Sequence, residues 1–312
     1  MKVELNTPWI DSPCFEQQLA ESGLDESRAD QVRSFAENGY LVFDPEIPHF
    51  DELADRIVAA CSDRPAYAAR IMDGWTATSA IRELAAAPRV LELLTLLYRR
   101  APIPMQTLNF GRGTQQLAHS DAFHFSSVPR GFVCGVWVAL EDSDADNGPL
   151  EVYPGSHRLP YFDLGDLGLT ASDQRRVELY SRYEQLVQQL IRDLALERHE
   201  LCLPRGSAVL WAANLLHGGS SVRDPARTRH SQVTHYYFAD CLYYQPQRSD
   251  PFLGRIHWLD KRDIRTGRPI PQVYHGRRRS LPQPLGQRVA SLARRLGWRL
   301  EPWRRRLSGR RV

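Results

Sequence analysis

Cysteine is scarce in this chain of 312 residues. The five cysteines are Cys14, Cys61, Cys134, Cys202 and Cys241. They are widely separated, odd in number and form no Cys-x-x-Cys motif, which argues against a disulfide framework and against a thiolate zinc site. A reducing compartment is the simpler interpretation, with each cysteine serving as a small buried apolar residue. We therefore predict a cytoplasmic protein.

Long apolar runs are missing as well. No segment approaches the roughly 18 apolar residues that a membrane span needs, and residues 1–13 lack the apolar centre of a signal peptide. The composition, 42% hydrophobic and 25% charged, is ordinary for a globular domain with a buried core. These features argue against a membrane-spanning or exported protein.

Acidic residues are almost absent from residues 276–312, which hold 12 arginines and one acid, Glu301. This segment carries +11, leaving −8 for the rest of a chain whose net charge is +3. From Leu285 onward, apolar residues recur every three or four positions between the arginines, which is typical of a basic amphipathic helix that Pro302 would shorten. The contrast in charge predicts a domain of residues 1–275 and a basic tail of residues 276–312.

Several interpretations of this tail remain open. It could dock on an anionic membrane surface, which would make the protein peripherally membrane-associated, or bind an acidic partner. It could instead pack its apolar stripe on the domain, or remain a solubilising, partly disordered extension. Charge alone would also allow nucleic acid, but no nucleic-acid-binding fold is indicated, so we rank that partner low.

The pattern of the domain changes near residue 101. Before it, helices are expected at residues 15–38, 51–62 and 80–99, with a short strand at 40–43. After it, strands are expected at residues 105–110, 115–119, 132–140, 150–153, 207–212 and 231–242, interrupted by a helical stretch at about 171–196. We therefore predict a mainly β fold with flanking helices. Its core, about residues 101–242, is expected to be a jelly roll, the cupin-like double-stranded β-helix, with N-terminal and inserted helices outside it.

One short motif offers metal-binding chemistry. The sequence LAHSDAFHF places His119 and Asp121 two residues apart, so both side chains can face one metal if the backbone is extended. A third ligand, His217, follows a strong predicted strand in WAANLLHGGSS. Two histidines and one carboxylate leave three positions open, as an iron(II) oxygenase requires. The His-x-Asp spacing alone is weak, because the chain has 10 histidines and many aspartates.

The surroundings of this motif make it specific. In order, they are Trp137-Val-Ala-Leu140, Asn147-Gly148, Pro154-Gly155-Ser156-His157, Arg205-Gly206, His217-Gly218, and Arg229 leading into the strand SQVTHYYF. Over about residues 39–242 this order and register resemble the phytanoyl-CoA dioxygenase family of iron(II)/2-oxoglutarate oxygenases. Each piece is common by itself, whereas the joint pattern is not.

The resemblance implies a role for each matching residue. His119, Asp121 and His217 would bind the metal, and Arg229 would bind the distal carboxylate of 2-oxoglutarate through its two-pronged guanidinium. Trp137, Gln116 and Ser220 would contact the co-substrate. The chain departs from the family at His217-Gly218-Gly219-Ser220, where the usual form is His-Gly-Ser, and its next loop is one residue longer. Arg227 therefore remains an alternative to Arg229, although the distance to His235-Tyr236 favours Arg229.

The resemblance also implies a reaction. Iron(II), 2-oxoglutarate and O2 would hydroxylate a C–H bond of a small-molecule, lipid-like or carrier-bound substrate, with succinate and carbon dioxide as co-products. Related halogenases replace the carboxylate ligand with a small residue, so Asp121 favours hydroxylation. The alternative is a non-catalytic or non-oxygenase metal-binding protein on the same scaffold, which would have no need of Arg229.

The remaining candidates are expected to be structural. They are His124, His157, His230, His235 and Trp211. His124 is interpreted as facing the substrate at most, His157 as bracing its turn, and the others as buried, hydrogen-bonded or core residues. Substrate-facing loops are expected at residues 67–78 and 159–196.

Overall fold

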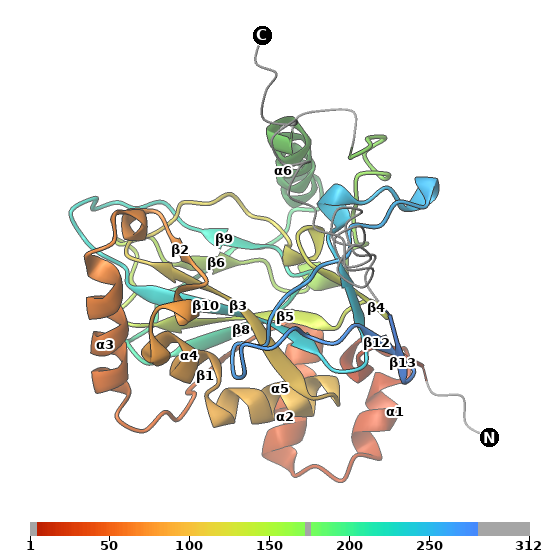
Figure 1. Ribbon diagram of the computed structural model, residues 1–312, viewed down its shortest axis with the longest axis horizontal. Helices are drawn as coiled ribbons and strands as arrows, with labels where there is room; N and C mark the ends of the chain where they lie inside the picture. Colours follow the sequence, from red (N-terminus) through yellow and green to blue (C-terminus); the bar gives the residue numbers. More distant parts are fainter. Residues whose placement is uncertain (1–4, 172–175, 280–312) are drawn as a thin grey trace, which may run out of the picture.

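Two antiparallel sheets face each other in the computed structural model, which describes residues 5–171 and 176–279 (Figure 1). The larger sheet has the order β1 (Tyr40–Phe43), β8 (Ala208–Ala212), β5 (Val133–Ala139), β10 (Ser231–Phe238), β3 (Pro102–Phe110) and β2 (Ile71–Met72). The smaller has the order β7 (His199–Leu201), β6 (Leu150–Val152) and β9 (His217–Gly219). The predicted mainly β, double-sheet jelly roll with helices outside it is therefore confirmed.

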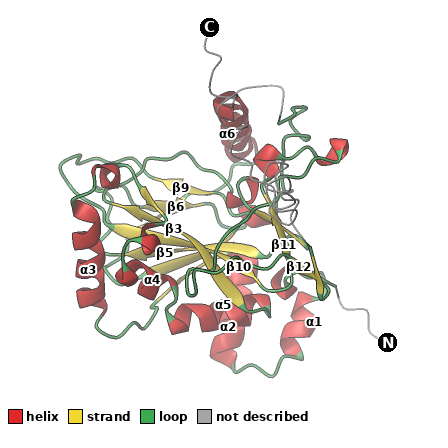
Figure 2. Cartoon of the chain, in the orientation of Figure 1, coloured by secondary structure: helices red, strands yellow, loops and turns green. Residues whose placement is uncertain are grey.

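The central strands of the large sheet are buried on both faces. In β5, Val136 and Val138 belong to the core shared with the helices, whereas Trp137 and Ala139 belong to the core between the sheets. All eight residues of β10 are buried, with β3 on one side and β5 on the other. Apolar side chains on both faces of a strand require a covering layer on each side. The helices supply one layer and the small sheet the other (Figure 2).

The N-terminal helices lie beneath the large sheet in the view of Figure 1, except for α3 (Phe50–Ser62), which stands at its left and contacts α4 (Ser79–Ala85). The others are α1 (Phe15–Ala20), α2 (Glu26–Asn38) and α5 (Pro88–Tyr98). The single helix predicted at 15–38 is wrong, because Asp25 caps a new helix by accepting from the backbone N–H of Arg28. The helix predicted at 80–99 is likewise two, since Pro88 begins α5 and cannot continue α4.

Two of the predicted strands also need correction. Residues 115–119 do not form a strand; His119 makes an isolated bridge with His217. The strand predicted at 231–242 ends at Phe238, and Leu242–Tyr244 forms a separate strand, β11, paired with β4 (Ser126–Val128). The predicted helix at about 171–196 is α6 (Arg176–Asp193).

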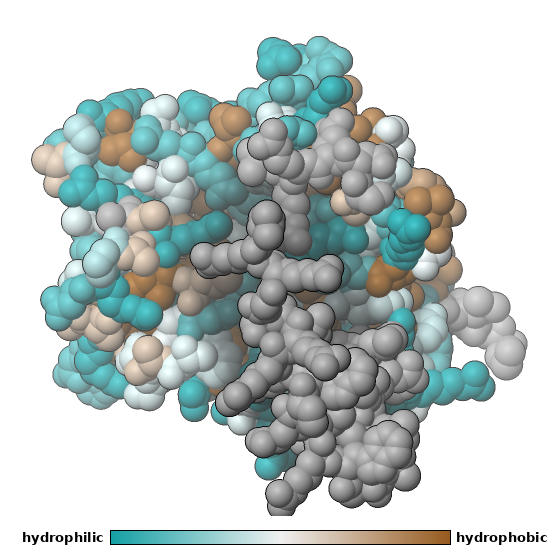
Figure 3. Space-filling model, turned by 45° about the horizontal axis from the view of Figure 1, so that its top comes forward, coloured by the Kyte–Doolittle hydropathy of each residue, from teal (hydrophilic) through white to brown (hydrophobic). Residues whose placement is uncertain are grey.

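The segment after β11 folds back onto the domain. It ends in a hairpin of β12 (Val273–Tyr274) and β13 (Arg277–Arg278), so the predicted boundary between residues 275 and 276 falls within this hairpin. Arg279 lies over the ring of Trp258, 3.5 Å from its centroid. The amphipathic helix predicted from residue 285 lies outside the described residues. Most of the described surface visible in Figure 3 is hydrophilic, with separate hydrophobic patches.

Within residues 5–171 and 176–279, no helix is both long and apolar enough to cross a membrane.

Candidate metal centre

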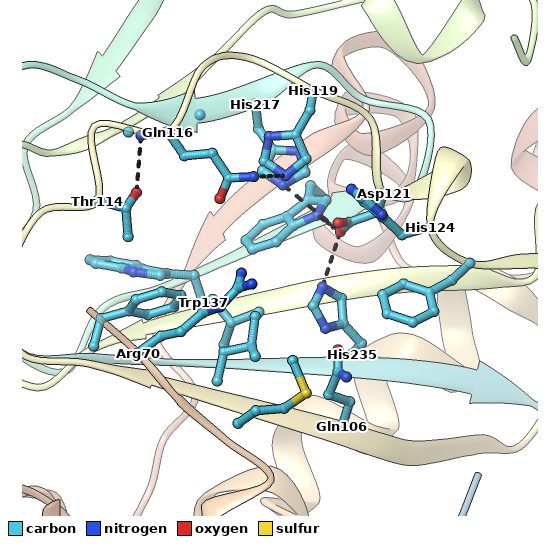
Figure 4. A pocket seen from close by; sticks show the side chains of 18 of the residues that line it. Arg70, Gln106, Thr114, Gln116, His119, Asp121, His124, Trp137, His217 and His235 are labelled. Atoms are coloured by element: carbon cyan, nitrogen blue, oxygen red, sulfur yellow. Dashed lines mark hydrogen bonds and ion pairs between the residues drawn. The ribbon is translucent and has the colours of Figure 1, made fainter. Parts of the chain in front are cut away.

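Backbone pairing brings two histidines side by side. The N–H of His119 donates to the carbonyl of His217 at 2.9 Å, and the N–H of His217 donates back at 3.0 Å. Their ring centroids are 4.6 Å apart. Asp121 begins a short 3-10 turn, Asp121–Phe123, whose N-cap is the extended residue Ser120. The ligand atoms of His119, Asp121 and His217 all lie within 4.8 Å of one another, so the three predicted ligands meet (Figure 4).

The two imidazoles share one orientation. Nδ1 of His119 lies 3.0 Å from the carbonyl oxygen of Leu117, and Nδ1 of His217 lies 3.0 Å from that of Leu215. Because a carbonyl oxygen can only accept, each Nδ1 carries the proton. Each Nε2 is then left with its lone pair toward the cluster, as metal-binding histidines require.

The carboxylate of Asp121 has two donors of its own. Its Oδ2 accepts from Nε1 of Trp211 at 2.8 Å and from Nε2 of His235 at 3.2 Å. Oδ2 also lies 3.8 Å from Nε2 of His217. Burial would raise the pKa of Asp121, but the neighbouring His235 and His217 outweigh burial and hold it well below the ordinary value. The carboxylate is therefore ionised.

The charge of this donor set suits a divalent cation. Burial, assisted by His217, lowers the pKa of His119 to about 3, and burial also lowers the pKa of His217. Both rings are thus neutral beside an ionised carboxylate. Two neutral imidazoles and one carboxylate, with open positions on one side, are the ligands typical of non-haem iron(II) sites. The residues present fit iron(II).

The cluster of His119, Asp121 and His217, called the metal cluster below, opens onto a cavity of about 530 Å³. Side chains that line it and bear on the chemistry are Arg70, Gln106, Gln116, His124, Phe125, Trp137, Arg229, His235, Gln245, Gln247, Arg248 and Lys261. Its volume is in the usual range for small-molecule sites. Figure 4 shows Gln116 reaching His119 and His235 reaching Asp121 across this space.

Arg229 is the most unusual group in the cavity. It is 4% exposed, yet its Nε has no hydrogen-bond partner among the described residues. Its guanidinium lies 5.6 Å from the ring centroid of Trp137, whose Nε1 also has no such partner. Burial lowers the pKa of Arg229 to about 10. A buried cation without a counter-ion is costly, so these unpaired donors fit an anionic ligand such as the carboxylate of 2-oxoglutarate.

The structure separates the other predicted co-substrate residues. Arg227 is on the surface, where it forms an ion pair of 2.8 Å with Asp144, and it does not line the cavity. Ser220 is buried outside the cavity lining, and its Oγ donates to Glu151 at 3.3 Å. Gln116 lines the cavity, with its Nε2 at 3.3 Å from Nε2 of His119. The structure thus brings Arg229, Trp137 and Gln116 to the cavity, but not Arg227 or Ser220.

Sequence reasoning missed the contacts of Trp211 and His235 with Asp121. Val233 and His235 alternate along β10, Arg229 lies two residues before that strand begins, and all three line the cavity, so the two-residue spacing from Arg229 was an available signal for His235. His157 does brace its turn, with Nε2 at 3.2 Å from the carbonyl of Ala36.

Only one of the two expected substrate loops contributes to the cavity wall, because Arg70 and Met72, from the loop expected at 67–78, line it. No described residue of 159–196 lines the cavity, although Tyr180 of α6 accepts from Gln116 at 3.4 Å. The segment from Gln245 to Lys261 also lines the cavity, although nothing in its sequence pointed to it.

A double-stranded β-helix with a buried His-Asp-His cluster defines a class of metal-dependent oxygenase scaffolds. The family model "Phytanoyl-CoA dioxygenase (PhyH)" matches residues 76–231, half of the chain. The chain belongs to the phytanoyl-CoA dioxygenase family, as predicted. This membership, with the donor set described above, supports iron(II) and 2-oxoglutarate as its cofactors and an oxygenase as its class of enzyme.

Similar proteins include phytanoyl-CoA dioxygenase domain-containing protein 1 of Danio rerio, 37% identical over 75 residues, which are 23% of this chain and 26% of that protein. The chain spans about a quarter of the length of the first curated relatives it matches.

Solved structures support the fold. The non-heme alpha ketoglutarate dependent epimerase SnoN from nogalamycin biosynthesis is 20% identical, with a TM-score of 0.55 over 78% of this chain and 95% of that one. The carbocyclase SnoK from the same biosynthesis is 17% identical, with a TM-score of 0.55 over 80% of this chain and 94% of that one.

Proposed function

We propose that this chain is an iron(II)- and 2-oxoglutarate-dependent dioxygenase that hydroxylates a C–H bond of a small molecule. One observation carries the proposal: the buried cluster of His119, Asp121 and His217 lines the same cavity as the buried Arg229, whose Nε has no hydrogen-bond partner among the described residues. A metal site alone would not need a buried cation. The two together match the two halves of a chelating dicarboxylate co-substrate, one end at the metal and the other at an arginine.

Each residue has a distinct task in this proposal. His119, Asp121 and His217 hold iron(II), while Arg229 orients 2-oxoglutarate through its distal carboxylate, with Trp137 beside it. When bound, iron(II) and 2-oxoglutarate supply the oxidising power with O2, and the protein supplies position and a water-poor cavity. Trp211 and His235 donate to Oδ2 of Asp121 and fix the carboxylate beside the two histidines, where it would hold iron(II) with them.

Hydroxylation is the reaction that Asp121 supports best. A carboxylate ligand occupies the position that a halide would need, so halogenation is disfavoured. Neighbours of the same fold include an epimerase and a carbocyclase, and a fold does not fix the reaction. The small-molecule substrate, whether lipid-like or carrier-bound, is therefore part of the proposal.

A non-catalytic metal-binding protein is the competing function. Such a protein gains nothing from Arg229, because the guanidinium loses solvation on burial and forms no ion pair with a carboxylate of the described residues. Retaining this costly group is better explained by a bound co-substrate.

Anaerobic titration with iron(II) and 2-oxoglutarate tests the proposal. A weak visible charge-transfer band should appear in the wild type, disappear in His119→Ala, and weaken in Arg229→Ala. The matched control is Arg227→Ala, on the same loop but outside the cavity, which should leave the band unchanged. Absence of the band from well-folded wild-type protein would overturn the oxygenase assignment.

The cytoplasmic location and the contacts of residues 276–312 with an anionic membrane or an acidic partner also stay predictions. Gly276 to Arg279 complete the hairpin, so the truncated variant should keep residues 1–279 and lack residues 280–312. Cosedimentation with anionic liposomes should be lost on truncation if the tail docks there, while the charge-transfer band persists. Equal sedimentation of both forms would reject membrane docking.

A further inference from the structure

The cavity holds more positive charge than its proposed cofactors use. Arg229 is assigned to 2-oxoglutarate, but Arg70, Arg248 and Lys261 also line the cavity. The acid in the lining is Asp121, which belongs to the metal cluster. Among the described residues, three cations therefore face the cavity with no acid of the lining left to neutralise them.

None of these three cations forms an ion pair of 4.0 Å or less with any acid within residues 5–171 and 176–279. Surface arginines elsewhere do: Arg205 pairs with Asp51 at 2.8 Å, for example. The Nε of Arg248 is buried without a hydrogen-bond partner in the described part of the chain. Burial lowers the pKa of Lys261, with Asp73 opposing that shift only from a distance. A bound anion would stabilise such partly buried cations, because it supplies the opposite charge that the described residues do not supply nearby.

The positions of these cations differ from that of Arg229. Gln247 is next to Arg248 in the chain, and its Nε2 lies 3.0 Å from Nδ1 of His124. Lys261 lies 5.7 Å from the ring centroid of Phe125. The Phe125 ring lies 5.2 Å from that of His235, which contacts Asp121. These contacts connect the segment 245–261 to the metal cluster, whereas Arg229 lies against Trp137.

Arg70 completes the group from another element. It is exposed, precedes β2, and is within electrostatic reach of His124 and of Tyr180 on α6. Apolar side chains accompany the cations, among them Met72, Phe125 and Leu259. The lining thus offers a charged region and an apolar region within one small-molecule cavity.

We infer that the substrate is an organic anion, whose carboxylate or phosphate is bound by Arg248 and Lys261, with Arg70 at the entrance. Its carbon skeleton lies along Met72, Phe125 and Leu259, which directs a C–H bond toward the metal cluster. This inference rests on the proposed oxygenase function and specifies its substrate class. Charge-assisted hydrogen bonds from two cations are expected to favour the anion over an uncharged analogue by about tenfold or more.

Calorimetric titration with matched probes tests this inference. The probes are octanoate with octanamide and 3-phenylpropanoate with 3-phenylpropanamide, and octyl phosphate distinguishes phosphate from carboxylate recognition. The full chain is loaded anaerobically with iron(II) and saturating 2-oxoglutarate, so that Arg229 is occupied. At least one anion should bind at least tenfold tighter than its uncharged partner. The preference should fall to near one in the double variant Arg248→Gln, Lys261→Met.

The control variant is Arg255→Gln, an exposed position in the same segment but outside the cavity lining, which should keep the preference. No preference for an anion on either skeleton, including no binding by any probe at millimolar concentration, would overturn the inference. So would a preference that survives in the double variant. The two proposals fail separately. A charge-transfer band that does not form with iron(II) and 2-oxoglutarate sinks the oxygenase function, whereas the anion preference is measured independently of the band by repeating the titration without cofactors.

Discussion

Trp211 and His235 donate to the same oxygen of Asp121, although they come from different strands. Their strands, β8 and β10, lie on either side of β5, and both residues are in register with Gly135 of that strand. The indole and the imidazole thus converge across one residue that has no side chain. The orientation of the carboxylate ligand is set by this row of three residues.

Replacing Trp211 by phenylalanine should weaken the metal site without unfolding the protein. The ring would still pack against His217, whose centroid is 4.5 Å away, but the 2.8 Å hydrogen bond to Asp121 would be lost. Loss of a hydrogen bond to a metal ligand typically costs 10- to 100-fold in affinity, so we expect at least about tenfold weaker iron(II) binding. Anaerobic metal titration measures it.

Trp9→Phe is the matched control for that variant, because the Trp9 indole donates to the carbonyl of Leu96, far from the cluster. It should leave iron(II) affinity unchanged. Equal affinities of Trp211→Phe and wild type would show that the indole N–H does not support Asp121.

Gly135→Ala should disturb the same row through packing. A Cβ at this position would lie 2.4 Å from Cε2 of Trp211, closer than real Cβ contacts allow. Overpacking of this kind costs about 1–3 kcal/mol, and displacement of the indole should also weaken iron(II) binding. Urea unfolding and metal titration measure the two effects. Gly165→Ala, in an exposed loop without positive φ, should change neither. Wild-type stability and affinity in Gly135→Ala would refute the role given to this glycine.

The metal ligands could be predicted from sequence, but their supports could not. His119, Asp121 and His217 stand in short motifs whose order along the chain is informative. The grouping of Gly135, Trp211 and His235 depends on the strand order β8-β5-β10, and no local pattern encodes which strands become neighbours.

The local β-propensity of the sequence also predicted a strand that does not form. Residues 115–119 are β-prone, yet only His119 finds a backbone partner there, so tertiary pairing decided against a strand. Arg248 and Lys261 gave no signal either, because they reach the cavity only when the chain folds back after β11.

Arg229→Gln should weaken 2-oxoglutarate binding by about 10- to 100-fold, because a charge-assisted contact to a carboxylate contributes about 1.5–3 kcal/mol. Glutamine keeps a donor but loses the charge, so the change tests the ion pair itself. Arg227→Gln, whose side chain pairs with Asp144 at the surface, should bind 2-oxoglutarate like the wild type. Anaerobic titration followed by the charge-transfer band gives both constants. If Arg227→Gln proved the weaker binder, the assignment of the two arginines would be reversed.

His157 should make the fold sensitive to acid. Its Nε2 donates to the carbonyl of Ala36, its ring lies against Gly39, and its buried Nδ1 has no hydrogen-bond partner among the described residues. Burial lowers the pKa of His157 to about 4, below the ordinary value of 6.5. Between these values the unfolded chain binds the extra proton and the folded chain does not, so stability falls as the pH drops from about 6.5 to 4.

The variant His157→Gln should therefore flatten the pH dependence of the free energy of unfolding. A neutral amide can still donate to Ala36, and the His157 contribution of up to a few kcal/mol across this interval would disappear. Urea unfolding of the metal-free protein at pH 7, 5.5 and 4.5 measures the slope. His275→Gln, at an exposed position, should retain the wild-type slope. A slope in His157→Gln as steep as the wild type would mean that the acid sensitivity originates elsewhere, and that the proton on His157 is accommodated in the folded state.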